Sequence, residues 1–155
     1  MIRLSIPEIG LSLDVRRDLL KEMYEIGKEH FPLEFGGLLL GNYSNNFNHL
    51  TINETLIPIK YKSSKVNFER STEGLEATLK DKYHKQPSQI YVGEWHTHPN
   101  NKAKPSTTDV LSIEAIANSK ECFLKNPVLL IIGYNDSDVE FAFYVFFNNK
   151  LYKYE

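Results

Sequence analysis

Apolar residues recur at helical spacing in three parts of the chain. The first helix is expected from about residue 14 to residue 30, because apolar side chains three or four positions apart form one face there. A second helix is expected from Ser71 until Pro87 ends it, and a third is expected to open at Ser106. One face of the first helix carries Val15, Leu19, Leu20, Met23 and Ile26. In the second helix Leu75, Leu79 and Tyr83 recur four residues apart, and the third helix carries Val110, Ile113 and Ala117 inward.

Shorter apolar runs between these helices predict strands. They cover residues 35–41, 50–59, 90–96, 128–132 and 139–147, after an apolar stretch at 2–6, and a polar strand-like segment lies at 65–68. In the run at 139–147 apolar residues alternate, which is typical of a strand with one buried face. Polar segments at 42–48 and 135–138 predict hairpin turns. The pattern therefore predicts an α/β (α+β) fold with a mixed central β-sheet flanked by helices.

Length and composition fit one packed unit. The chain has 155 residues, of which 41% are hydrophobic and 12% aromatic, and this is enough apolar surface for a core. An eight-fold α/β barrel needs roughly 250 residues and is excluded. No repeat, low-complexity tract or linker rich in Pro and Gly divides the sequence. We therefore expect residues 1–155 to form a single domain.

Charge and cysteine content indicate which partners and which cellular compartment to expect. The 18 Lys and Arg residues nearly balance the 20 Asp and Glu residues, so we expect neither nucleic acid nor a membrane as a partner. No apolar run approaches the ~18 residues of a membrane span, and the N-terminus lacks the features of a signal peptide. We expect a cytoplasmic protein in which the only cysteine, Cys122, is a small core residue.

His96 and His98 form a candidate metal site. They are two residues apart at the end of a predicted strand, whose period of two places both imidazoles on the same face. A catalytic Zn²⁺ takes three protein ligands, imidazole and carboxylate among them, and keeps one open position. A carboxylate must therefore join the pair. Asp109 is the leading candidate, because the loop at 99–105 turns the chain back and places Asp109 in the first turn of the next helix.

Two alternatives remain open for these carboxylates. Ser106 and Asp109 also have the spacing of a capping box, in which the Ser side chain accepts a helix N–H and the Asp side chain accepts the N–H of the Ser. Glu94 shares the strand face of His96 and His98, and it is a rival third ligand in a Glu-x-His-x-His set.

Three segments together carry a resemblance to a known family. Residues 96–99 (HTHP) and 106–109 (STTD) are spaced as His-x-His-x7-Ser-x-x-Asp, and residues 34–41 (EFGGLLLG) lie upstream. This combination resembles the JAMM signature of the JAB/MPN metalloprotease family. The resemblance implies a small JAB/MPN-like (cytidine-deaminase-like) fold with one Zn²⁺. Residues 93–99 (GEWHTHP) further resemble short bacterial deconjugating peptidases that accompany ubiquitin-like ligation enzymes in anti-phage operons.

The resemblance also implies roles for single residues. His96, His98 and Asp109 would be the zinc ligands, Glu34 would hydrogen-bond the attacking water as general base, and Ser106 would donate to the oxyanion. The family hydrolyses amide bonds, very often the isopeptide between the C-terminal glycine of a ubiquitin-like protein and a lysine. We therefore expect a zinc-dependent isopeptidase. Two alternatives remain, namely a processing peptidase for a sulfur-carrier protein and a non-catalytic MPN scaffold that only binds partners.

A substrate tail is expected to bind as an added strand. Residues 60–68 form a polar, strand-capable segment of the kind found at sheet edges. Addition to an edge relies on main-chain hydrogen bonds and demands no particular side chain. Lys65, Val66 and Asn67 in this segment are therefore the candidate substrate-binding residues.

Overall fold

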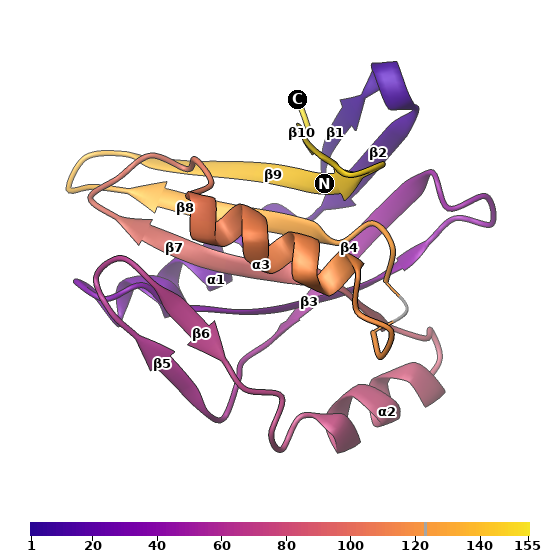
Figure 1. Cartoon of the computed structure of the whole chain (residues 1–155), viewed down its shortest axis with the longest axis horizontal. Helices are drawn as coiled ribbons and strands as arrows, with labels where there is room; N and C mark the ends of the chain where they lie inside the picture. Colours follow the sequence, from indigo (N-terminus) through magenta and orange to yellow (C-terminus); the bar gives the residue numbers. More distant parts are fainter. Residues whose placement is uncertain (123) are drawn as a thin grey trace.

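A computed structural model of the chain describes residues 1–122 and 124–155 (Figure 1). Within these residues, eight strands form one mixed sheet in the order β1-β2-β4-β3-β7-β8-β9-β10, and β5 and β6 form a second sheet. The strands are β1 (Ile2–Ile6), β2 (Leu11–Val15), β3 (Gly36–Tyr43), β4 (His49–Leu56), β5 (Tyr61–Ser63), β6 (Phe68–Arg70), β7 (Ile90–Pro99), β8 (Val128–Tyr134), β9 (Val139–Phe147) and β10 (Lys150–Lys153). The helices are α1 (Arg17–Lys28), α2 (Glu76–His84) and α3 (Thr107–Ala117), with a 3₁₀ turn at Pro7–Ile9.

Strand β7 lies in the middle of the large sheet and carries both histidines of the candidate site. It pairs antiparallel with β3 on one side and parallel with β8 on the other. A parallel pair needs a crossover connection, and here the chain leaves β7 at Pro99, passes through α3 and returns in β8. The crossover brings the first turn of α3 back beside the end of β7 (Figure 1).

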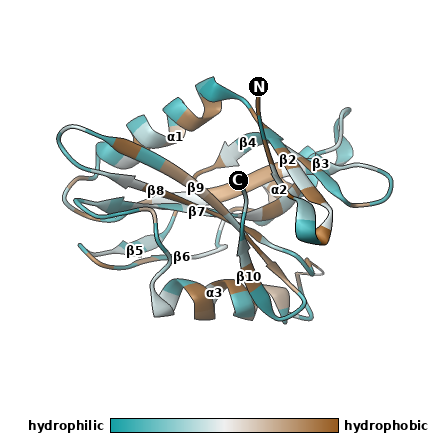
Figure 2. Ribbon diagram, turned by 90° about the horizontal axis from the view of Figure 1, so that it is seen from above, coloured by the Kyte–Doolittle hydropathy of each residue, from teal (hydrophilic) through white to brown (hydrophobic). Residues whose placement is uncertain are grey.

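Apolar side chains fill both faces of this sheet, and α1 and α3 cover opposite faces (Figure 2). The larger core packs Leu20 and Met23 of α1 against strand residues such as Leu130. The smaller core packs Ile113 of α3 against Ile131 of β8. Because Ile113 lies one turn after Asp109, its burial anchors the start of α3 over β8 and β9.

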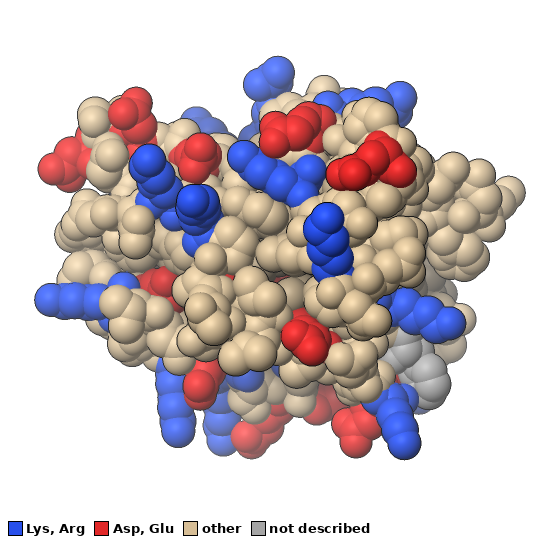
Figure 3. Space-filling view, turned by 45° about the horizontal axis from the view of Figure 1, so that its top comes forward, with Lys and Arg blue, Asp and Glu red and all other residues tan. Residues whose placement is uncertain are grey.

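The two edges of the large sheet also meet. The N–H of Ser5 in β1 donates to the carbonyl of Glu155 at 2.8 Å, and the N–H of Glu155 donates back at 3.0 Å. The sheet therefore curls around the larger core. Charged residues of both signs are interspersed over the surface face that Figure 3 presents. None of the helices in the described residues is long and apolar enough to cross a membrane.

A mixed sheet with helices on its faces confirms the fold class expected from the sequence. Helices α1, α2 and α3 fall where apolar spacing predicts them, but α1 begins at Arg17 rather than near residue 14. Residues 11–15 form β2 instead, since Val15 pairs with Ile2 of β1 and packs into the larger core. The second helix begins at Glu76 rather than at Ser71.

Two local expectations are wrong. Residues 65–67 are the turn between β5 and β6 rather than part of a strand, and Val66 at this turn is 83% exposed. Cys122 is exposed rather than in the core. It follows Lys120 and Glu121 in a polar connection, and that setting outweighs the tendency of cysteine to be buried.

Candidate metal centre

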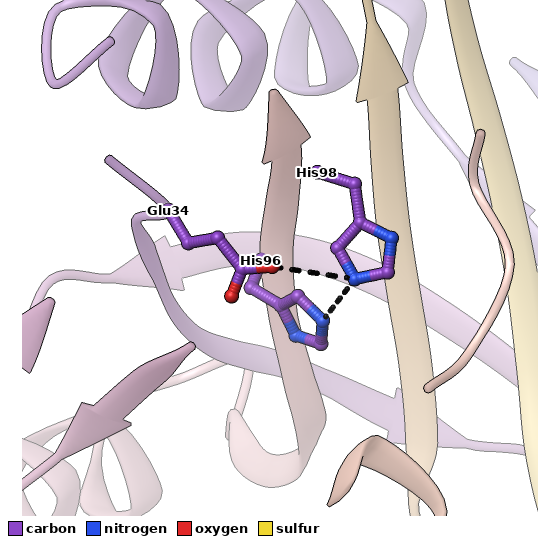
Figure 4. A group of neighbouring side chains, drawn as sticks. All are labelled: Glu34, His96 and His98. Atoms are coloured by element: carbon purple, nitrogen blue, oxygen red, sulfur yellow. Dashed lines mark hydrogen bonds and ion pairs between the residues drawn. The ribbon is translucent and has the colours of Figure 1, made fainter. Parts of the chain in front are cut away.

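The two imidazoles of β7 lie side by side on one face of the sheet (Figure 4). Their Nε2 atoms are 3.2 Å apart. His96 lies opposite Gly36 of β3 in the strand register. A Cβ atom on Gly36 would overlap the carbonyl oxygen of Trp95 and stand 2.9 Å from Cα of His96. Glycine at this position therefore allows β3 to approach the backbone that carries His96.

The ring of His98 is held by a main-chain carbonyl. Its Nδ1 lies 3.1 Å from the carbonyl oxygen of Lys102. A carbonyl oxygen only accepts, so Nδ1 carries a proton, and in the neutral ring Nε2 then has the lone pair that can bind a metal ion. The loop can approach because residue 133 of β8 is glycine. A Cβ atom on Gly133 would stand 2.6 Å from the carbonyl carbon of Lys102.

Asp109 faces both imidazoles from the first turn of α3. Its Oδ1 lies 3.2 Å from Nε2 of His96, and its Oδ2 lies 3.1 Å from Nε2 of His98. The same Oδ2 accepts the main-chain N–H of Ser106 at 2.9 Å, while Oγ of Ser106 accepts the N–H of Asp109 at 3.1 Å. The capping box and the candidate metal site are therefore one arrangement rather than two alternatives.

Glu34 reaches the cluster from the segment before β3 (Figure 4). Its side chain is buried, and its Oε1 lies 3.5 Å from Nε2 of His98. The β5–β6 hairpin fixes its main chain: the N–H of Glu34 donates to the carbonyl of Ser64 at 2.8 Å, and the hydroxyl of Ser63 donates to the carbonyl of Glu34. The structure thus brings Glu34, His96, His98 and Asp109 together.

Burial and close contact shift the pKa values of this cluster. Burial raises the pKa of Glu34, and the nearby imidazoles only partly offset this effect. Burial lowers the pKa of His98, but hydrogen bonds to Asp109 and to the Lys102 carbonyl outweigh it and raise that pKa overall. Burial disfavours the charged form of Asp109, yet hydrogen bonds from His96 and His98 hold its pKa well below its usual range. Asp109 is thus ionised at neutral pH, whereas Glu34 is the better proton acceptor.

The donor atoms of this cluster suit Zn²⁺. Zinc binds imidazole nitrogen and carboxylate oxygen at about 2.0–2.2 Å in a tetrahedron, so its donor atoms stand about 3.3 Å from one another. The Nε2 atoms of His96 and His98 and the oxygens of Asp109 lie 3.1 to 3.2 Å apart. Glu34, His96 and His98 also offer donor atoms within 4.8 Å of one another. Two histidines and one carboxylate could therefore hold the ion, with the second carboxylate beside it.

Glu94 lies on the same face of β7 as the histidines, but it has another partner. Its two carboxylate oxygens accept hydrogen bonds from Nε and Nη2 of Arg70 at 2.8 and 2.7 Å. The hydroxyl of Tyr91 donates to the same carboxylate. The structure does not bring Glu94 into the donor cluster, and this speaks against the Glu-x-His-x-His alternative.

A groove of about 380 Å³ runs past the cluster. Residues of β6 form one wall and residues of α3 the other, and His96 and Asp109 lie among the lining residues. Of the candidate substrate-binding residues, Asn67 lines this groove, whereas Lys65 and Val66 are exposed at the tip of the hairpin. The groove could receive an extended chain that passes the candidate metal ligands.

Some residues that shape the site give no signal in the sequence. Thr97 lies between the two histidines and is fully buried, and its hydroxyl accepts the N–H of Phe35 at 3.0 Å. This contact fixes the residue next to Glu34. Lys102 contributes only a main-chain carbonyl, and Ser63 is distant from Glu34 in the sequence, so neither residue type predicts its role.

Comparison with protein families covers most of the chain. Residues 16–145 match the family model described as prokaryotic homologs of the JAB domain. This chain belongs to the JAB family. The matched segment of this JAB-domain protein contains the five residues to which the JAMM resemblance assigns a role, namely Glu34, His96, His98, Ser106 and Asp109.

Two curated relatives and one solved structure resemble this JAB-domain protein. It is 34% identical to a CD-NTase/cGAS isopeptidase of Enterobacter hormaechei subsp. hoffmannii over 101 residues. The aligned segment covers 64% of this chain and 55% of that protein. It is 32% identical to a CD-NTase/cGAS isopeptidase of Pseudomonas aeruginosa over 110 residues. Here the aligned segment covers 69% of this chain and 67% of that protein. The chain thus spans little more than half the length of the first relative. The solution structure of a Desulfitobacterium hafniense protein shares the fold, with a TM-score of 0.67 and 17% identity over 91% of this chain and 88% of that one.

Proposed function

We propose that this JAB-domain protein is a zinc-dependent isopeptidase that removes a ubiquitin-like protein from a conjugated target. The observation that carries the proposal is the convergence of His96, His98 and Asp109 beside the buried carboxylate of Glu34. Three donors of these types leave an open position on zinc, as a hydrolytic site requires. A carboxylate outside that set suits a general base.

The residues divide the work of hydrolysis among them. His96, His98 and Asp109 would hold Zn²⁺, which when bound acts as a Lewis acid on the scissile carbonyl and makes a water molecule more acidic. Glu34 accepts the proton of the attacking water and passes it to the leaving amine, and burial supports this role because it raises the pKa of the carboxylate. Oγ of Ser106 accepts an N–H, so its own proton remains to be donated to the developing oxyanion.

The names of the relatives support the class of substrate. Two proteins that match this chain are CD-NTase/cGAS isopeptidases. We therefore propose that the substrate is a CD-NTase joined to a ubiquitin-like protein, and that the protein acts in bacterial anti-phage defence. The chain carries Glu34 and three suitable donors, which a scaffold that only binds partners would not need. The alternative is processing of a sulfur-carrier protein, and the assay below distinguishes it from isopeptide cleavage.

The register of the hairpin favours a substrate tail that lies along β6. Main-chain hydrogen bonds join Ser64 to Asn67 and Ser71 to Lys60 at the two ends of the hairpin. Bonded pairs alternate along an antiparallel ladder, so the N–H and C=O groups at residues 68 and 70 point away from β5. Both residues line the groove. A tail in this groove would therefore pair with β6 rather than with Lys65 and Val66.

Two labelled probes test the proposed activity. One is an extended peptide that ends in Gly-Gly and is joined through its terminal carboxyl group to the ε-amine of a lysine. The other carries the same tail in a linear fusion. We expect the isopeptide to be cleaved after the second glycine, a chelator to stop cleavage and added Zn²⁺ to restore it. Preference for the linear fusion would favour the sulfur-carrier alternative, and cleavage of neither probe by zinc-loaded protein would contradict the proposal.

Modified tails test the docking along β6 without any change to the enzyme. An N-methyl group at one position of the tail removes one main-chain donor. Successive N–H groups of a strand point to opposite sides, so we expect cleavage to be lost for N-methyl groups at every other position only. Equal tolerance at all positions would exclude strand addition and leave the hydrolytic chemistry unaffected.

A further inference from the structure

The β5–β6 hairpin forms a sheet of its own beside the large sheet (Figure 1). Contacts near Glu34 and contacts of Arg70 attach it to the rest of the protein. In the first group of contacts, the rings of Tyr61 and Phe68 pack on Phe35, with ring centroids 5.0 and 5.3 Å away. This contact adjoins Glu34. In the second group, Arg70 at the end of β6 bonds to Glu94 of β7. The two attachments differ in kind, because the first combines apolar packing with hydrogen bonds between Glu34 and the hairpin, whereas the second is ionic.

The ionic attachment is directional. Two hydrogen bonds join the Arg70 guanidinium to both oxygens of Glu94, and the hydroxyl of Tyr91 donates to the same carboxylate. The side chains of Arg70 and Glu94 are 18% and 17% exposed, so both charges are largely removed from water. A bidentate pair fixes the relative orientation of its two groups. Loss of one partner leaves the other charge buried without compensation.

The pair also lies in the groove of the candidate site. Arg70 and Glu94 line this groove together with His96 and Asp109. Glu94 precedes His96 by two residues and shares its face of β7. The pair therefore lies beside the path that an extended tail follows before its last carbonyl reaches the candidate metal ligands.

We propose that the Arg70–Glu94 pair positions the edge of β6 for substrate binding. This inference rests on the isopeptidase function proposed above. The pair holds the end of β6 at a fixed distance from β7, so that the outward main-chain groups at residues 68 and 70 meet the tail at the spacing of paired strands. Arg70 and Glu94 are thus positioning residues, which act on the substrate through β6 and take no part in bond cleavage.

Kinetics with two isopeptide probes separates positioning from general stability. One probe carries the extended tail, and the other carries only Gly-Gly on the same labelled lysine. Arg70→Gln removes the ion pair. We expect it to raise KM for the extended probe about tenfold with kcat unchanged, because only binding along β6 is lost. Zinc content and the kinetics of the short probe should remain as in the wild type.

Two further variants make the test independent of folding defects. Arg70→Glu combined with Glu94→Arg rebuilds the pair with the charges exchanged, and it should recover most of the lost KM. Lys62→Gln removes a positive charge from exposed β5 of the same hairpin and should leave KM unchanged. An unchanged KM in Arg70→Gln, an equal rise for both probes, or no recovery in the exchanged pair would overturn the proposal. If the zinc-loaded wild type cleaves neither probe, the isopeptidase function itself is contradicted, and this inference falls with it.

Discussion

Ser106 and Asp109 bond to each other's main chain, and this exchange aims the carboxylate of Asp109 at the two imidazoles of β7. A capping box usually serves only to satisfy the free N–H groups at a helix start. Here it also fixes the rotamer of a candidate metal donor. Ser106 therefore helps to arrange the candidate metal ligands without being a metal ligand itself.

Substitution of Asp109 should abolish metal binding. We expect Asp109→Ala to purify without zinc, because two imidazoles alone leave the site without its third donor. Glu94→Gln should keep a full zinc content, since Glu94 bonds to Arg70. Elemental analysis of the purified proteins decides between these residues. Zinc retained in Asp109→Ala but lost in Glu94→Gln would reverse the assignment.

Glu34 is expected to act on the proton rather than on the metal. Glu34→Gln keeps the shape of the side chain but cannot accept a proton, so kcat should fall by at least about 100-fold. Zinc content and the melting temperature should stay at wild-type values. Full turnover with bound zinc would remove Glu34 from the mechanism. Loss of zinc would instead make Glu34 a ligand, in line with its place among the close donor atoms.

Gly133 should affect zinc affinity although it is not one of the candidate metal ligands. Gly133→Ala would push away the loop that holds the Lys102 carbonyl on Nδ1 of His98. Removal of such a contact typically lowers metal affinity by about 10- to 100-fold. Competition with a zinc-binding dye measures this change. As a control, Gly10→Ala strains a residue with φ +69° in open space, and it should lower stability without changing zinc affinity.

The stability of the fold should depend on pH through Asp14, which lies on β2 next to the edge strand β1. Hydrogen bonds from Arg3 at 2.7 Å lower the pKa of Asp14, although burial opposes them. The folded-state pKa therefore lies below the unfolded value of about 3.9, so the carboxylate stabilises the fold at higher pH and loses this effect as the pH falls through the folded-state pKa. Asp14→Asn should lower the free energy of unfolding at neutral pH, and denaturation at a series of acidic pH values should show the difference from the wild type shrinking. A difference that stays constant as the pH falls well below the unfolded value of about 3.9 would contradict this linkage.

Local patterns explain what the sequence predicts well. The spacing of His96 and His98 and the capping pattern of Ser106 and Asp109 each extend over a few residues, and both arrangements are present. Glu34 differs because it lies far from the histidines in the chain, and only pairing of β3 with β7 brings it close. Its proposed role therefore came from the family resemblance and not from any pattern around it.

Short elements explain most of the errors. Strands β5 and β6 have three residues each, too few for a period of two to be recognised, so Val66 at their turn looked like a strand residue. Val15 ends β2 immediately before α1, and its spacing to Leu19 happens to continue the helical pattern. Contacts made by main-chain atoms, such as the Lys102 carbonyl on His98, have no counterpart in residue identity.

Two of the three proposed donors lie on β7, a strand paired on both sides, and the third lies on a helix that caps itself. Hydrogen bonds between protein atoms hold the side chains of His98 and Asp109, so we expect the site to form without an ion. Zinc fingers, in contrast, fold only when metal binds. Uptake and release of zinc would therefore be reversible events in an already folded protein. The proposed activity of one molecule would then depend on the concentration of free zinc, and it would be lost and recovered repeatedly without unfolding of the protein.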